Sequence, residues 1–163
     1  MDRIDFLKNM LNSRLFKGLS LEHMDELISL AESQYFTTGI TVIKESDNAD
    51  SFFWVESGRL EVQLAHTQVK NKIPISYITA GDLFGEMVLL GFEKRSASVV
   101  AKEKSNLFMW KAHDCLKLFQ QNKDIGYQVA MNLASILGSR IRDMNLMLRN
   151  YADILGPDAV RFL

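Results

Sequence analysis

A short segment in the middle of the chain carries residue types that can hold a phosphate beside a sugar. Gly85 lets the backbone approach a ligand closely, and free amides after it can hold an anion. Glu86 can accept a hydrogen bond from a hydroxyl group. Arg95 offers a guanidinium fork for a phosphate, with the Ser96 hydroxyl and the Ala97 amide beside it. This combination suits a nucleotide, which has both an anion and hydroxyl donors; the alternative is a Glu86–Arg95 salt bridge that only fixes the turn.

The sequence shows no other arrangement that would indicate catalysis or metal binding. We find no Ser/His/Asp set, HExxH motif, Walker loop or GxGxxG motif. The three histidines are scattered without metal-ligand spacing, so we expect no metal and no cofactor. The lone Cys115 is most simply a buried structural thiol. We therefore predict that the protein is not an enzyme.

The elements that must position these residues follow from the periodicity of the apolar side chains. Residues 1–34 predict two helices, one from Ile4 to Phe16 and one capped by Ser20 and continuing through Ala31. In residues 35–111, apolar and polar side chains alternate with a period of two in short segments. Turns that contain Gly or Asn/Asp separate these segments, which predicts a small β-roll or jelly roll. Residues 112–155 return to the helical period, and residues 156–163 form a tail.

The last predicted helix starts at Asn122 and carries a sustained apolar seam. Its roughly 30 residues would extend for about 45 Å, which is more than one small roll can cover. We therefore favour a two-fold dimer through this helix over a helix that packs only on its own roll. The seam residues recur at steps of four and three: Ala130, Ala134, Leu137, Ile141, Met144, Leu148, Tyr151 and Leu155.

The segment from Gly81 to Val99 resembles the phosphate-binding cassette of the cyclic nucleotide-binding domain superfamily. The Gly-Glu pair, the apolar spacer and the Arg-Ser-Ala-x-Val run recur at the family's spacing, and Gly58 resembles its glycine turn between roll strands. The resemblance covers nearly the whole chain. It implies an α+β fold like the sensor domain of catabolite activator proteins: an eight-stranded β-roll, N-terminal helices and a long C-terminal dimerisation helix.

The resemblance implies a role for the residues of the cassette, which we place at 84–97. Glu86 would bind the ribose 2′-hydroxyl, and Arg95 would pair with the cyclic phosphate, helped by Ser96 and the Ala97 amide. Val88 departs from the family, which has Ala, Gly or Ser at this position, so its extra methyl groups would narrow the pocket or tilt Glu86. Further cassette residues would line the ligand pocket: Phe84, Gly85 and Met87.

Residues outside the cassette would surround the base. Arg140 falls where the family often caps the base, and its guanidinium would stack on the purine or donate to it. Asn145, one turn further along, is a second candidate. Arg140 is alternatively a solvated arginine or the partner of Asp143 on the other helix of the dimer. Inside the roll, three residues match positions near the base: Val62, Ile75 and Ser76.

Length and composition narrow the possible functions. The chain has 163 residues, a formal net charge of −1, one cysteine and no apolar run long enough to span a membrane. These values favour a single cytoplasmic domain with no affinity for DNA or membranes. After Leu155 the chain is too short for the helix-turn-helix module of the family's transcription factors.

The sequence thus predicts a stand-alone sensor dimer that binds a cyclic nucleotide and relays this binding to an effector protein. Ser96 is compatible with cAMP or cGMP, and the bacterial character of the chain favours cAMP. The alternative is a ligand-free or degenerate scaffold of the same fold that acts through protein–protein contacts. Val88 is the feature that favours this alternative.

Overall fold

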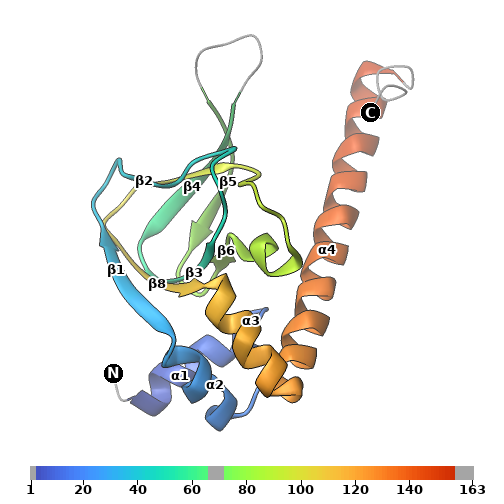
Figure 1. The fold of residues 1–163 in the computed structure, drawn as a ribbon. Coiled ribbons are helices and arrows are strands. Elements are labelled where there is room, and N and C mark those ends of the chain that lie inside the picture. Colours follow the sequence, from blue (N-terminus) through green and yellow to red (C-terminus); the bar gives the residue numbers. More distant parts are fainter. Residues whose placement is uncertain (1–2, 66–71, 157–163) are drawn as a thin grey trace.

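The computed structural model describes residues 3–65 and 72–156, and two antiparallel sheets of four strands form its centre (Figure 1). The strand order is β1-β8-β3-β6 in one sheet and β2-β7-β4-β5 in the other. The predicted eight-stranded β-roll is thereby confirmed. The strands are β1 Ala31–Phe36, β2 Thr41–Ile43, β3 Ser51–Ser57, β4 Arg59–Leu64, β5 Ile73–Thr79, β6 Leu83–Phe84, β7 Ser98–Ala101 and β8 Ser105–Lys111.

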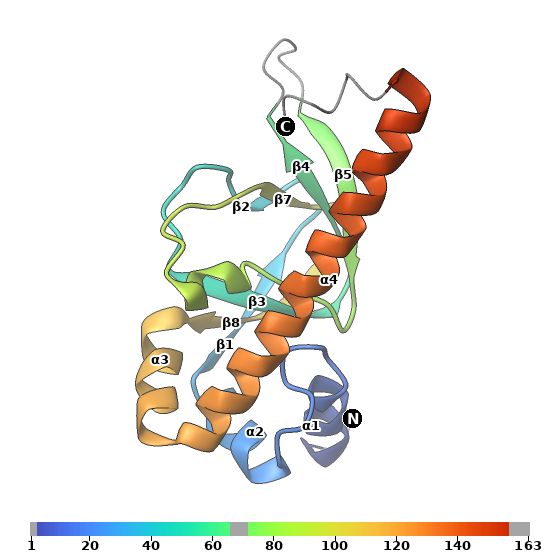
Figure 2. The same cartoon turned by 90° about the vertical axis from the view of Figure 1, so that its right-hand side faces the viewer.

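Helices cover one end of the roll, and the longest of them passes along its side (Figures 1 and 2). They are α1 Arg3–Leu11, α2 Leu21–Ile28, α3 Ala112–Gln121 and α4 Lys123–Leu155, with a short 3₁₀ helix, η1 Glu86–Leu90, between β6 and β7. Ser20 caps α2 by accepting a hydrogen bond from the His23 amide at 3.1 Å. Asn122 caps α4 in the same way, accepting from the Ile125 amide at 3.4 Å. None of the described helices is long and apolar enough to cross a membrane.

Strand β3 shows why an uninterrupted apolar run forms a strand in this fold. Phe52 and Trp54 pack into the cluster under the helices, whereas Phe53 and Val55 pack into the interior of the roll. Successive side chains of a strand point to opposite faces, so β3 is buried on both sides. The indole of Trp110 stacks on Phe52 and donates a hydrogen bond to the Leu27 carbonyl at 2.8 Å, which ties β8 to α2.

The N-terminal helical segment is shorter than the sequence predicts. Helix α1 ends at Leu11, so Leu15 and Phe16 lie in the α1–α2 loop, although both are fully buried. Strand β1 begins at Ala31, which pairs with Trp110, so residues 31–34 belong to the roll. Their mostly polar side chains show no clear period, and it is pairing with β8 that makes them a strand. The predicted tail after Gly156 lies outside the described residues.

Candidate functional site

A cavity of about 600 Å³ lies between the roll, η1 and α4. Asn145 is the one predicted ligand residue that does not line it; this residue is exposed on α4, and its proposed role stays a prediction. The fold brings the other predicted residues together from five elements and the loops between them. These residues are Val62, Ile75, Ser76, Phe84, Gly85, Glu86, Met87, Val88, Arg95, Ser96, Ala97 and Arg140.

Gly85 allows the close approach that the cassette requires. Its φ angle of +77° lies in the left-handed region, where a side chain is strained. A Cβ atom at this position would also lie 2.8 Å from Nη1 of Arg95 and 3.3 Å from the Ser51 carbonyl oxygen. A larger residue would therefore displace the arginine. Gly58 is similarly constrained, because it has a φ of +100° and an added Cβ would meet Ser105 at 2.2 Å.

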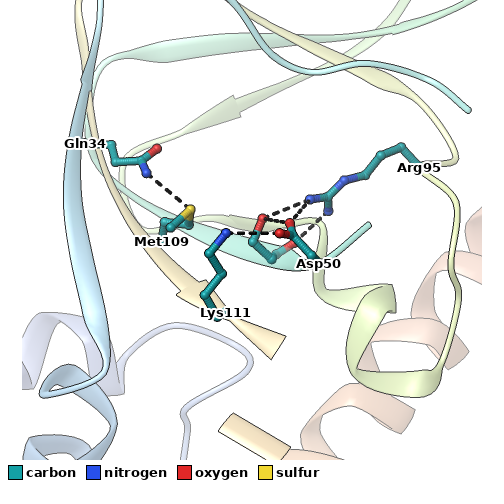
Figure 3. A network of polar contacts seen from close by, with 6 residues as sticks. Gln34, Asp50, Arg95, Met109 and Lys111 are labelled. Atoms are coloured by element: carbon teal, nitrogen blue, oxygen red, sulfur yellow. Dashed lines mark hydrogen bonds and ion pairs between the residues drawn. The ribbon is translucent and has the colours of Figure 1, made fainter. Parts of the chain in front are cut away.

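Arg95 is held in place by the start of β3. Its guanidinium donates from Nη1 to the Ser51 carbonyl at 2.6 Å and from Nη2 to the Ser51 hydroxyl at 3.0 Å. Asp50 lies 3.9 Å from Nη2 and also accepts a hydrogen bond from Lys111 at 3.0 Å. Figure 3 shows Arg95 and Lys111 converging on Asp50. The arginine therefore shares its nearest carboxylate with a lysine.

The electrostatics of Arg95 favour an anionic ligand. The side chain is only 7% exposed, and burial lowers the pKa of its guanidinium, an effect that Asp50 opposes. The pKa of Asp50 is itself lowered, first by its hydrogen bond to Lys111 and then by that to Ser51. Arg95 stays charged, because a guanidinium does not lose its proton in proteins. A buried cation with one distant, shared carboxylate is poorly compensated, and a phosphate would compensate it.

Glu86 is the second buried charge of the cavity, at 2% exposure. Its Oε1 atom forms an ion pair with Nη1 of Arg140 at 2.5 Å. The pair lacks an aligned hydrogen bond, so Oε1 has no hydrogen-bond partner among the described residues. The carboxylate has further lone pairs, which could accept from a hydroxyl donor of a ligand beside this ion pair. Glu86 thus pairs with Arg140, and the Glu86–Arg95 salt bridge considered from the sequence is not formed.

Val88 lines the cavity and also belongs to the hydrophobic cluster that joins η1 to the helices. It is 9% exposed, and Ile136 of α4 lies in the same cluster. Glu86 still lines the cavity with Val88 in place. Val88 therefore contributes to the packing beneath the cassette, and the Glu86 carboxylate remains in the pocket.

Several residues at the site belong to no sequence motif that would have assigned them to it. Arg14 lines the cavity from the α1–α2 loop, far from the cassette in the chain. Ser51 accepts from Arg95 through its carbonyl oxygen, which any residue would offer, and through its hydroxyl, and no motif marks it. Met144 lines the cavity although its spacing assigned it to the apolar seam of α4. The described residues contain no group of three or more His, Cys, Asp or Glu side chains that could hold a metal ion.

Comparison with known proteins agrees with this geometry. Residues 33–122, which include the whole cassette, match the family described as the cyclic nucleotide-binding domain. The chain belongs to the cyclic nucleotide-binding domain family.

Two proteins illustrate the relationship. The chain is 32% identical over 139 residues to the cyclic AMP receptor protein of Thermus thermophilus, an alignment that covers 85% of this chain and 62% of that protein. It is 34% identical over 97 residues to a cAMP-dependent protein kinase regulatory subunit of Colletotrichum orbiculare, covering 60% of this chain and 23% of that protein. The chain therefore spans less than two thirds of either relative.

The fold is shared with a solved structure. The crystal structure of the Thermus thermophilus catabolite activator protein superposes with a TM-score of 0.76 and 31% sequence identity. The superposition covers 86% of this chain and 63% of that chain. The catabolite activator-like arrangement of roll and long C-terminal helix is thus confirmed.

Proposed function

We propose that this protein is a receptor for a cyclic nucleotide, with cAMP as the first candidate, and that it relays binding to a partner protein. The observation that carries the proposal is the pair of buried charges, Glu86 and Arg95, on one cavity wall. A cyclic nucleotide offers a phosphate to Arg95 and a ribose hydroxyl to the carboxylate of Glu86. The named receptor and regulatory-subunit relatives support a binding role for this chain.

The arrangement suggests how binding is passed to α4. The phosphate would pair with Arg95, beside Ser96 and Ala97, and the ribose hydroxyl would donate to Glu86 beside its ion pair with Arg140. The base would then lie near Val62, Ser76 and the part of α4 that carries Arg140. Because α4 contributes this arginine to the pocket, the affinity for the ligand would depend on the position of α4, and binding would favour the position with the higher affinity. The response is then a shift between two populations of α4 positions.

We also propose that α4 forms a homodimer. Apolar seam residues are exposed in the single chain, among them Ile141 at 59% and Tyr151 at 59%. Ala130 and Ala134 are exposed as well and would allow close approach of a second helix. Leu137 and Leu148 are half-buried. A second copy of α4 would cover this apolar seam and so remove it from water.

The first experiment measures thermal unfolding of the protein with cAMP, cGMP and cyclic dinucleotides. A ligand at 100 times its Kd stabilises the folded state by about 2.7 kcal/mol, which raises the Tm of a chain of this size by roughly 5–11 °C. We expect this shift with cAMP, followed by a Kd from calorimetry. A larger shift with cGMP would retain the receptor and change its ligand.

The second candidate function is a scaffold that needs no ligand. The Arg140–Glu86 ion pair favours it, because this pair already neutralises the buried carboxylate from within the chain. Val88 pointed to this alternative in the sequence, but Glu86 still lines the cavity beside it. If no nucleotide in the panel shifts the Tm at millimolar concentration, the receptor proposal is wrong and the scaffold is supported.

The dimer is tested by sedimentation of two matched variants. Ile141→Glu places a charge in the apolar seam, and we expect it to produce monomers at concentrations where the wild type is dimeric. Asn150→Glu adds the same charge on the opposite side of the helix, nine residues away, and should leave the dimer intact. A wild type that sediments as a monomer at all concentrations contradicts the dimer.

A further inference from the structure

The α1–α2 loop is fastened along one face of α4. The Asn132 side-chain amide donates to the Leu15 and Lys17 carbonyls at 2.8 and 2.7 Å. Arg14 donates from Nη2 to the Ser139 hydroxyl at 2.9 Å. Asn132 and Ser139 are seven residues apart, which is close to two helical turns, so they lie on one face. Figure 2 shows this loop beside the middle of α4.

Helix α4 changes character at Ser139. Before this residue, Ile125, Val129, Leu133 and Ile136 are buried against the rest of the chain. From residue 140 to residue 154, every side chain is exposed except two that are half-buried. The hydrogen bond from Arg14 thus holds α4 at the last position before its exposed half begins.

Arg140 is the first residue of the exposed half and reaches Glu86 from there. Its position depends on the helical turn that carries both Ser139 and Arg140. In the single chain the buried contacts of α4 end at Ile136, one turn before Arg140, so the Arg14–Ser139 hydrogen bond and the Arg140–Glu86 ion pair are the polar contacts that hold this turn. Arg14 therefore contacts Ser139, the residue directly before Arg140, whose side chain pairs with Glu86.

We propose that Arg14 is a positioning residue of the nucleotide site, which holds Ser139 and thereby directs Arg140 toward Glu86 and the ligand. Arg14 lines the same cavity but lies outside residues 33–122, the part that matches the family. This inference rests on the proposed function for its effect on ligand binding. Its effect on α4 is independent of any ligand.

The first test follows hydrogen exchange in the unliganded protein. Arg14→Gln removes the guanidinium, and Ser139→Ala removes its acceptor. We expect either change to speed amide exchange over residues 143–150 by about threefold or more, while residues 125–136 keep their protection. Arg142→Gln is the matched control, because Arg142 is exposed on α4 and does not line the cavity. Unchanged exchange over residues 143–150 in both variants would overturn the proposal.

The second test measures the Kd for cAMP, or for whichever cyclic nucleotide shifts the Tm, by calorimetry. We expect Arg14→Gln to weaken binding by about threefold to fivefold and Arg140→Gln by about tenfold. Because Arg14 acts through Arg140, the double variant should bind no more weakly than Arg140→Gln alone. If Arg14→Gln has its full effect in the Arg140→Gln background, Arg14 contacts the ligand itself and the positioning role is wrong.

These results separate the two proposals. A wild type that binds no cyclic nucleotide rejects the proposed function, and hydrogen exchange then decides the role of Arg14 alone. A wild type that binds, together with an Arg14→Gln variant of unchanged affinity, rejects the positioning role and retains the receptor.

Discussion

The two ends of the cavity differ in how deeply their side chains are buried in the unliganded protein. At the cassette end, Glu86 and Arg95 are almost fully buried and held by β3 and α4. At the other end, Ile75, Tyr77 and Met144 are all at least half exposed, with Met144 at 60%. The difference teaches that, in the proposed receptor, the charged groups assigned to the sugar and phosphate would be preorganised. The apolar groups assigned to the base would be completed only by the ligand, by movement of α4 or by the proposed second copy.

The largest effect should come from the cassette end. Arg95→Gln removes a charge-assisted contact to the phosphate worth about 1.5–3 kcal/mol, so affinity should fall by roughly tenfold to a hundredfold. Calorimetry measures the change, with Arg142→Gln as a control for loss of one positive charge. Equal affinity of Arg95→Gln and wild type would show that the preorganised end does not bind the ligand.

Gly85→Ala should rank second, and Gly91→Ala is its matched control. Both glycines have a left-handed φ, of +77° and +83°, so each substitution should cost about 1–2 kcal/mol of unfolding free energy. Only at Gly85 does the added Cβ meet Arg95, whereas nothing lies within 4 Å at Gly91. We therefore expect Gly85→Ala alone to weaken nucleotide binding, by about tenfold. Equal losses of affinity in both variants would contradict the role of the close approach.

Val88→Ala separates packing from ligand binding at the cassette end. Removing two buried methyl groups should lower the unfolding free energy by about 1–3 kcal/mol, measured in urea. Affinity should stay within about threefold of wild type, since this side chain packs in the helical cluster. A gain of affinity of tenfold or more would show instead that Val88 narrows the pocket.

The smallest effect should come from the exposed end. Met144→Ala should change the unfolding free energy by less than about 0.5 kcal/mol, because Met144 is a surface residue in the single chain. Its contact with the base should be worth about threefold in affinity or less. A loss as large as that of Arg95→Gln would remove the contrast between the two ends.

The cassette was predictable because its residues are close together in the chain. Gly85, Glu86 and Arg95 define both the turn and the chemistry, and their spacing is visible without the fold. Arg140 was predicted to cap a base, yet its pairing with Glu86 depends on how α4 lies against η1. Arg14 was missed because only folding brings the α1–α2 loop to the cavity.

The limits of the fold prediction have a similar origin. The ends of the α4 helix were visible in its Asn122 cap and its terminal Gly156. The start of β1 at Ala31 was not, since it depends on pairing with β8. Leu15 and Phe16 have helical spacing, but they lie in a loop that runs along α4 and are buried there. Local periodicity reports which residues are buried and cannot by itself report which element buries them.

The burial of Cys115 has a practical consequence for spectroscopy. This residue is the chain's single cysteine, it is fully buried, and burial raises the pKa of its thiol to about 12. A thiol with such a pKa is almost entirely protonated at neutral pH and inert toward labelling reagents. A cysteine introduced at the exposed Asn150 would therefore accept a single nitroxide or fluorophore without removal of the native one. In the proposed dimer, the distance between the labels of the two copies would record the movement of α4 in the otherwise unaltered protein.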